Sequence, residues 1–213
     1  MTSETTKKVK ILVLGDSAVG KTSLVHLICT KEALSNPAWT VGCSLEVKLH
    51  EYGTGSLTQP YFLEFWDVGG SPAHANGRQV FYHQANGIVL VYDLTNRKSH
   101  TNLLKWLGEY HQSVSGGKGT SKSDTEYDPE SFVEQSIPMI VVGTKQDLAD
   151  SPLLKTTSMV TGADLITVDC TNVRQFSLDS PLVIQLNKFF DKVIERRFFP
   201  SYHMVSERVQ LIE

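Results

Sequence analysis

The most informative stretch of the chain is Gly15-Asp16-Ser17-Ala18-Val19-Gly20-Lys21-Thr22. It matches the pattern G-x-x-x-x-G-K-[ST], and it stands between a continuous apolar run at 9–14 and a stretch at 22–30 with apolar residues at helical spacing. Glycines in such a strand-loop-helix setting let backbone N–H groups converge on a phosphate at the positive N-terminus of the helix. Lys21 can reach the β- and γ-phosphates of a nucleotide, and the Thr22 hydroxyl can ligate Mg²⁺. The stretch therefore predicts a phosphate loop.

Short apolar runs alternate with longer stretches of helical period along the rest of the chain, which is typical of strand-helix-strand units. The run at 45–49 alternates Leu45, Val47 and Leu49 with charged residues, and this period predicts a half-buried strand. Gly53-Thr54-Gly55 separates it from the run at 61–66, so the two can pair as a hairpin. The six predicted strands are 9–14, 45–49, 61–66, 88–92, 139–142 and 165–168.

Length, charge and cysteine content exclude several classes of protein. The 213 residues suit one domain with insertions, and the formal charge of 20 − 23 = −3 provides no basic field for nucleic acid. No run is long enough for a signal sequence or a membrane span, so we expect a cytoplasmic protein. Cys29, Cys43 and Cys170 cannot all pair and show no metal-site spacing. No cysteine follows Cys170, so this chain offers no prenyl anchor, and membrane contact is expected through partners unless the C-terminus is truncated.

We expect a flexible N-terminus at 1–8, one domain at 9–199 and a C-terminal tail at 200–213. Residues 113–131 contain little to bury and are expected as a mobile insertion, either a solvated loop or a partner-binding loop. A long terminal helix is predicted from Leu182 to Ile194, because apolar residues recur at helical spacing before Pro200. Its apolar face is expected on the sheet, and the alternative is a helix lying on a membrane.

A metal site needs more than one ligand, and Asp67 is placed to supply another. It closes the predicted strand 61–66, where a carboxylate would hold Mg²⁺ through water. Gly70 follows three residues later, and its N–H could approach a γ-phosphate closely because no side chain intervenes. A D-x-x-G string alone is weak evidence, but it gains weight downstream of a phosphate loop.

The motifs in order are the phosphate loop, Thr40-Val41-Gly42, Trp66-Asp67-Val68-Gly69-Gly70 and Gly143-Thr144-Lys145-Gln146-Asp147. Over 9–199 the chain resembles Ras-superfamily small GTPases, and it is most similar to the Rab-like branch. The resemblance implies an α/β fold of three layers, with a six-stranded, mostly parallel sheet and one antiparallel edge strand. It also implies binding of GTP or GDP with Mg²⁺, effector and regulator proteins that bind the two switches, and a role in vesicle traffic.

The resemblance assigns roles residue by residue. Thr40 in the first switch would complete the Mg²⁺ shell, Asp67 and Gly70 would open the second switch, Lys145 would lie along the base, and Asp147 would accept two hydrogen bonds from guanine. The implied nucleotide-binding residues are Ser17, Ala18, Val19, Gly20, Lys21, Thr22, Ser23, Gly70, Thr144, Lys145, Asp147, Cys170, Thr171 and Asn172. The implied metal ligands are Thr22, Thr40 and Asp67.

The chain departs from the family at the position of the catalytic Gln, which is Ser71. The serine side chain is too short to orient a water in line with the γ-phosphate, so no catalytic residue is assigned and hydrolysis is expected to be slow. His74, Asn76 or Gln79 could substitute, although each is more often an ordinary switch residue.

Three further departures concern the base. Thr144 replaces the Asn that usually ties the base loop to the phosphate loop, and a threonine hydroxyl can make only part of that network. Cys170-Thr171-Asn172 stands where Ser-Ala-Lys is usual, so a backbone N–H to the guanine carbonyl is expected to survive. Ala33 stands where the family places an aromatic residue against the base.

Trp39, just before Thr40, is an unusually large apolar residue for a switch. Pointing inward it would shield the nucleotide or pack on the core, and pointing outward it would anchor a partner. An exposed Trp39 and weak catalysis would also suit a homodimer.

Three functions remain open at this point. The first is a guanine-nucleotide switch whose switches are ordered by the γ-phosphate and Mg²⁺. The second is a scaffold whose bound nucleotide is structural. The third, an ATPase or kinase of another phosphate-loop family, is disfavoured by Lys145-Gln146-Asp147.

Overall fold

The computed structural model describes residues 7–114, 137–149 and 163–200. Most of the predicted insertion at 113–131 and of the two predicted tails lies outside these residues; Ser113 itself lies in a helix. The strands are β1 (Lys8–Leu14), β2 (Cys43–Tyr52), β3 (Gln59–Val68), β4 (Gly87–Asp93), β5 (Met139–Thr144) and β6 (Asp164–Thr167). The α-helices are α1 (Lys21–Thr30), α2 (Ala75–Arg78), α3 (Arg97–Thr101), α4 (Leu103–Val114) and α5 (Pro181–Phe198). Single 3₁₀ turns lie at Gly55–Leu57, Pro72–His74, Gln79–Phe81, Gln146–Leu148 and Val173–Phe176.

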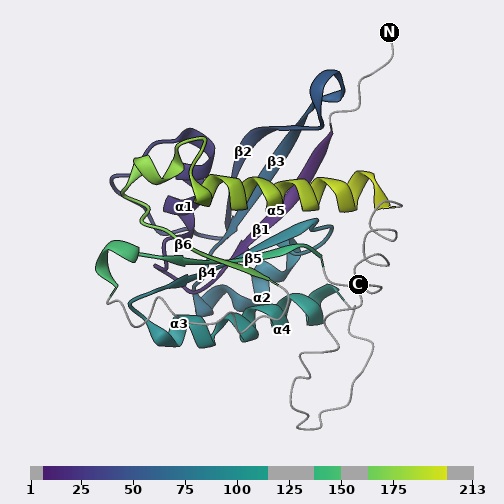
Figure 1. Ribbon diagram of the computed structural model, residues 1–213. Coiled ribbons are helices and arrows are strands. Elements are labelled where there is room, and N and C mark those ends of the chain that lie inside the picture. Colours follow the sequence, from purple (N-terminus) through teal and green to yellow (C-terminus); the bar gives the residue numbers. More distant parts are fainter. Residues whose placement is uncertain (1–6, 115–136, 150–162, 201–213) are drawn as a thin grey trace, which may run out of the picture.

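The six strands form one sheet in the order β2-β3-β1-β4-β5-β6 (Figure 1). All neighbours run parallel except β2 and β3, which pair antiparallel as the predicted hairpin. Gly53 makes the hairpin turn possible, because its φ is 125° and a Cβ there would come within 2.6 Å of the Leu57 carbonyl oxygen. The expected six-stranded sheet with one antiparallel edge strand is therefore confirmed.

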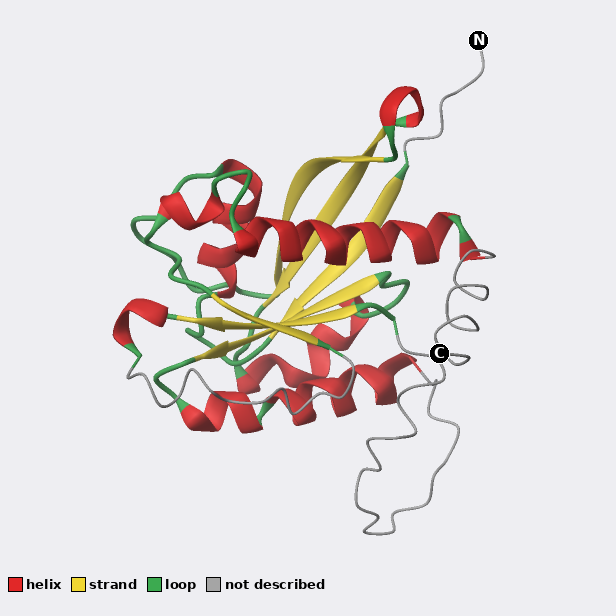
Figure 2. Ribbon diagram, viewed as in Figure 1, coloured by secondary structure: helices red, strands yellow, loops and turns green. Residues whose placement is uncertain are grey.

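Helices cover both faces of the sheet, which gives three layers (Figure 2). The helices α1 and α5 lie on one face, and α2, α3 and α4 lie on the other. Every residue of β4 is buried, as expected for a central parallel strand covered on both faces. The core is accordingly divided into two buried clusters, one on each side of the sheet.

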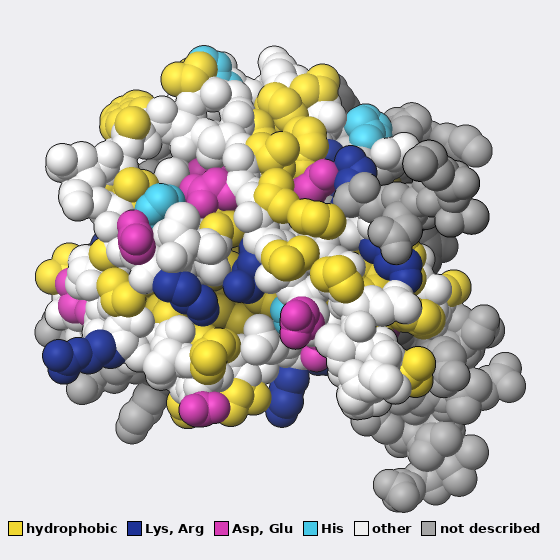
Figure 3. All heavy atoms as spheres, turned by 90° about the horizontal axis from the view of Figure 1, so that it is seen from above, with side chains coloured by type: hydrophobic (Ala, Val, Ile, Leu, Met, Phe, Trp, Pro, Cys, Tyr) yellow, Lys and Arg dark blue, Asp and Glu magenta, His cyan; other side chains and the backbone are white. Residues whose placement is uncertain are grey.

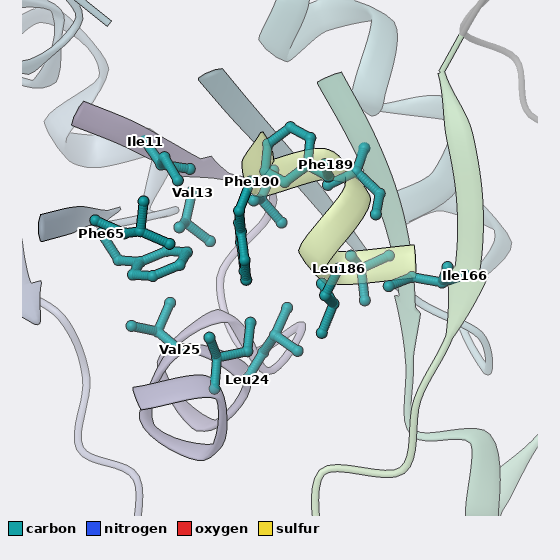
Figure 4. Close-up of a cluster of buried hydrophobic side chains, with 14 of the residues drawn as sticks. Ile11, Val13, Leu24, Val25, Phe65, Ile166, Leu186, Phe189 and Phe190 are labelled. Carbon is teal, nitrogen blue, oxygen red and sulfur yellow. The ribbon is translucent and has the colours of Figure 1, made fainter. Parts of the chain in front are cut away.

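Helix α5 packs on the sheet as predicted. Ser180 caps its N-terminus by accepting a hydrogen bond from the Val183 N–H, and Pro181 occupies the first turn. Leu186, Phe189 and Phe190 point toward Leu24 and Val25 of α1 and toward Phe65 and the sheet (Figure 4). No helix within the described ranges is long and apolar enough to cross a membrane.

The edge strand β2 is half-buried, but the face it buries is not the apolar one. Leu45, Val47 and Leu49 are 52%, 48% and 56% exposed, whereas His50 is buried. The polar side of β2 faces the helices, where His50 Nε2 lies 2.8 Å from Asp191 Oδ1 and the Tyr52 hydroxyl donates to Glu195 at 2.9 Å. The alternation predicted a strand correctly, but it implied the wrong buried face, because polar groups on α5 satisfy the polar residues of β2.

Charged side chains of both signs are mixed on one face of the molecule. On the face shown in Figure 3, the basic side chains lie scattered among acidic ones, with hydrophobic side chains between them. Among the described residues drawn on this face, no continuous basic surface is present.

Candidate functional site

The residues expected in the site come together at the carboxyl ends of the parallel strands. The phosphate loop follows β1, Asp67 lies near the end of β3, and Thr144 ends β5. In open α/β sheets this edge is where ligands bind, because loops from neighbouring strands meet there.

The phosphate loop has the backbone that its sequence predicts. Gly15 passes so close to β4 that a Cβ would come within 2.1 Å of the Val91 carbonyl oxygen, and Gly20, with φ 91°, turns the chain into α1. Lys21 is buried, and its Nζ donates to the carbonyls of Gly15 at 2.9 Å and Asp16 at 2.8 Å. Burial lowers the pKa of Lys21 to about 8, against the opposing effect of nearby Asp67. The lysine therefore provides a buried cation at the phosphate loop.

Three hydroxyl groups surround the buried carboxylate of Asp67. Oδ2 of Asp67 accepts hydrogen bonds from Thr22 at 2.5 Å, Thr40 at 3.3 Å and Ser44 at 3.4 Å, and the Thr22 and Thr40 hydroxyls are 3.1 Å apart. Burial raises the pKa of Asp67, although the hydroxyls and Lys21 oppose that rise. Phosphate loop, first switch and second switch thus meet at one carboxylate.

The other oxygen of this carboxylate, Asp67 Oδ1, is buried and has no hydrogen-bond partner among the described residues. A buried carboxylate oxygen without a partner is costly, and hard oxygen ligands are the ones that Mg²⁺ prefers. Thr22, Thr40 and Asp67 therefore fit the magnesium site expected from the sequence.

The start of the second switch lies directly against the phosphate loop. A Cβ at Gly70 would come within 2.4 Å of the backbone of Asp16 and Ser17, so this position tolerates no side chain. Gly69 donates its N–H to the Gly42 carbonyl at 2.8 Å, which joins the second switch to the first. The Gly70 amide is thereby held at the loop expected to carry the phosphates. Ser71, next in the chain, is extended and partly buried.

On the base side, Thr144 ties two loops together as its Asn counterpart would. It is fully buried, and its hydroxyl lies within hydrogen-bond distance of the carbonyls of Val19 and Tyr92. Lys145 has a left-handed backbone conformation, and its Nζ forms an ion pair with Asp93 Oδ2 at 2.7 Å. Asp147 is exposed in the turn that follows, where its carboxylate is accessible to a ligand.

The third base segment, at 170–172, makes hydrogen bonds within its own loop. The Thr171 N–H donates to the Asp169 carboxylate at 2.8 Å, and the Asn172 N–H donates to the Asp169 carbonyl at 3.1 Å. The Asn172 side chain in turn caps the following 3₁₀ turn. The amide expected to bind the guanine carbonyl is thus engaged within its own loop, and a bound base would have to share or replace that bond.

Two residues near the base and first switch point outward. Trp39 is 82% exposed and Val41 is 79% exposed, so the expectation that Trp39 could pack on the core is wrong. Ala33 is exposed and leaves the base side of the site without the usual aromatic cover. The remaining expected contacts, Ala18, Val19 and Ser23, lie in or directly after the phosphate loop.

Ser44 and Asp93 were not among the residues predicted from the sequence to form the site. Asp93 could have been found, because it closes an apolar run as Asp67 does. Ser44 carries no local signal, since its place beside Asp67 depends on the pairing of β2 with β3.

Comparison with known proteins decides the family. The family model for Ras matches residues 10–173, which include every sequence motif quoted above and end before α5 begins at Pro181. The chain belongs to the Ras family of small GTPases. Rab-like protein 3 of Danio rerio is 44% identical over 90% of this chain and 88% of its own length, and that of Homo sapiens is 43% identical over 90% and 86%. The small GTPase LIP1 of Arabidopsis thaliana is 37% identical over 67% of this chain and 42% of its own length.

Membership of this family implies, in general terms, a guanine-nucleotide and Mg²⁺ site. The resemblance to the Rab-like branch found in the motifs is confirmed by these relatives. The identity to the two Rab-like relatives extends over most of the chain, so the six-stranded fold is that of the same family.

Proposed function

We propose that this Ras-family chain is a guanine-nucleotide switch that binds GTP and GDP with Mg²⁺ and hydrolyses GTP slowly. The observation that carries the proposal is the convergence of Thr22, Thr40 and Asp67, with one buried carboxylate oxygen left unpartnered. Mg²⁺ bound there would neutralise charge on the β- and γ-phosphates. Thr40 is joined to the phosphate loop through this cluster, so whether the first switch is ordered would depend on whether Mg²⁺ and the γ-phosphate are bound there.

Four residues of the site have separate roles in nucleotide binding. Lys21 holds phosphate oxygens with a buried charge, and the Gly70 amide lies where a γ-phosphate would be contacted. Asp147 accepts hydrogen bonds from the guanine edge, a donor pair that adenine does not present. Lys145, oriented by Asp93, lies along the base.

The binding assignment is tested by three variants. Lys21→Ala removes the buried cation, and Thr22→Asn disturbs the metal cluster, so calorimetry should show weaker GTP and Mg²⁺ binding. Asp147→Asn offers a donor where guanine has donors, so it should raise binding of XTP relative to GTP. Unchanged competition between GTP and XTP would remove the support for Asp147 as the base-reading residue.

Slow hydrolysis follows from Ser71. We expect a single-turnover rate at or below the roughly 10⁻⁴ s⁻¹ scale of an unassisted small GTPase. Ser71→Gln should restore part of the turnover, and Ser71→Ala is the matched control. A wild-type rate hundreds of times above that scale, unaffected by Ser71→Ala, would show that another residue or a partner supplies the catalytic group.

A second candidate function is a scaffold with a structural nucleotide, favoured by the absence of the catalytic Gln at Ser71. In both cases partners would bind at the switches, and the exposed Trp39 provides an apolar anchor for them. GTP that persists on the protein without any turnover would favour the scaffold.

A further inference from the structure

A buried ion pair joins the second switch to helix α4. Arg78, 7% exposed, donates from Nε to Glu109 Oε1 at 2.6 Å, and its Nη2 donates to Oε2 of the same carboxylate. The Tyr82 hydroxyl donates to Glu109 Oε1 at 2.7 Å. The guanidinium lies 3.9 Å from the centre of the Trp106 ring. Both carboxylate oxygens and one face of the guanidinium are therefore engaged, which fixes the position of the arginine.

The same arginine makes a contact at the nucleotide site. Arg78 Nη1 donates to the Ser71 carbonyl at 3.2 Å. Ser71 directly follows Gly70, the residue whose backbone lies against Asp16 and Ser17. Arg78 thus holds the neighbour of the amide that would contact the γ-phosphate.

Helix α4 also contacts the phosphate loop. The indole N–H of Trp106 donates to Asp16 Oδ1 at 2.9 Å, and Asn102, just before α4, donates to Asp16 Oδ2 at 2.7 Å. Trp106 is therefore shared, because its N–H holds the phosphate loop while its ring contacts Arg78. Each of these contacts joins two groups of the chain itself.

We propose that Arg78 is a positioning residue that keeps Ser71, and with it the Gly70 amide, docked on the phosphate loop whether GDP or GTP is bound. The inference rests on the proposed function. The first switch would then carry the response to the γ-phosphate, since Thr40 is joined to the loop through the hydroxyl and carboxylate cluster. A pre-positioned Gly70 amide also favours GTP over GDP, because the segment is already ordered and GTP binding does not have to supply the entropy lost on ordering it.

Hydrogen exchange tests the docking directly. In wild type with Mg²⁺, the exchange rate of each amide in residues 68–82 should differ by no more than about threefold between the GDP and GTPγS states. The exchange rates of amides in residues 38–42 should differ more between these two states. In Arg78→Ala, exchange of 68–82 in the GDP state should rise about tenfold or more. A comparable rise in wild type on going from GTPγS to GDP would overturn the proposal.

Nucleotide affinity separates positioning from a loss of stability. Arg78→Ala should lower GTPγS affinity by about tenfold and leave GDP affinity within about twofold, whereas a variant that merely destabilises the fold lowers both. Arg78→Lys should resemble Arg78→Ala, because one ammonium cannot serve Glu109 in bidentate fashion and also reach Ser71. A normal affinity ratio in Arg78→Lys would refute the geometry.

The control is Asp164→Asn, which removes an exposed ion pair with Lys192 at 3.2 Å on the far edge of the sheet. It should change neither the exchange of 68–82 nor the affinity ratio. If wild type bound no guanine nucleotide, the proposed function would fail, but the docking contact would still be testable. Exchange of 68–82 should then be slow in wild type and fast in Arg78→Ala without any nucleotide.

Discussion

Thr144→Val removes the one side-chain link between the base loop and the phosphate loop that the structure shows at this position. The threonine hydroxyl has a single proton, and it lies between two buried carbonyl oxygens, those of Val19 and Tyr92. Valine has nearly the same shape as threonine and keeps its methyl group at this buried position. The substitution therefore isolates the hydrogen bond from the packing.

The expected loss can be worked from these contacts. One hydrogen bond disappears and a buried carbonyl is left without it, which costs about 1–3 kcal/mol. For a chain of this length about 1 kcal/mol corresponds to roughly 2–4 °C in Tm, so we expect Tm to fall by about 2–12 °C. Because Val19 lies in the phosphate loop, GDP should also dissociate several times faster.

Thermal unfolding and the release of a fluorescent GDP analogue measure the two effects. Thr144→Ser is the matched control, because it keeps the hydroxyl and loses one methyl, worth about 0.8 kcal/mol. GDP release in Thr144→Ser should stay close to wild type. If Thr144→Val released GDP as slowly as wild type, or if both variants released it equally fast, the hydroxyl link would not hold the phosphate loop.

Further predictions concern the core, the ion pair and the base. Phe190→Ala should cost about 3–5 kcal/mol in denaturant unfolding, whereas Val41→Ala, at a position 79% exposed, should stay within about 0.5 kcal/mol. Burial alone would raise the pKa of Glu109, but hydrogen bonds from Arg78 and Tyr82 hold it below its ordinary value of 4.5. The ionised Glu109 carboxylate therefore stabilises the fold fully above pH 4.5, and this stabilisation is lost as pH falls through the lower pKa of the folded state. The difference in free energy of unfolding between wild type and Glu109→Gln should accordingly become smaller below about pH 4. Asp93→Asn should lower affinity for GDP and GTP alike by about tenfold in fluorescence titrations, because Lys145 loses its ion pair, and the exposed Asp179→Asn should have no effect.

The parts of this protein that could be predicted from sequence are those set by local pattern. The phosphate loop, the hairpin and the meeting of Thr22 with Asp67 follow from motif spacing and from the shared edge of parallel strands. The direction of Trp39 could not be predicted, because a single large residue in a loop has no periodicity to show which way it points.

The remaining features depend on contacts between distant segments. The alternation at Leu45, Val47 and Leu49 is the same whichever face of β2 is covered. The buried face is set by polar partners on α5, which cannot be read from the strand itself. Arg78 and Glu109 lie 31 residues apart, and charged residues at that separation carry no signal of pairing. Thr171 could be matched to the family motif, but its bond to Asp169 arises from the conformation of its own loop.

The identity of the nucleotide that the protein carries is the most direct measure of its function. The purified full chain is denatured, the released small molecules are separated by chromatography, and the same protein is then reloaded with equal GTP and ATP in Mg²⁺. We predict that guanine nucleotides are released and that GTP displaces them in competition with ATP. The Lys21→Ala variant should retain far less guanine nucleotide than wild type. Release of adenine nucleotide, or equal loading with ATP, would contradict the account of Asp147 and of the site as a whole.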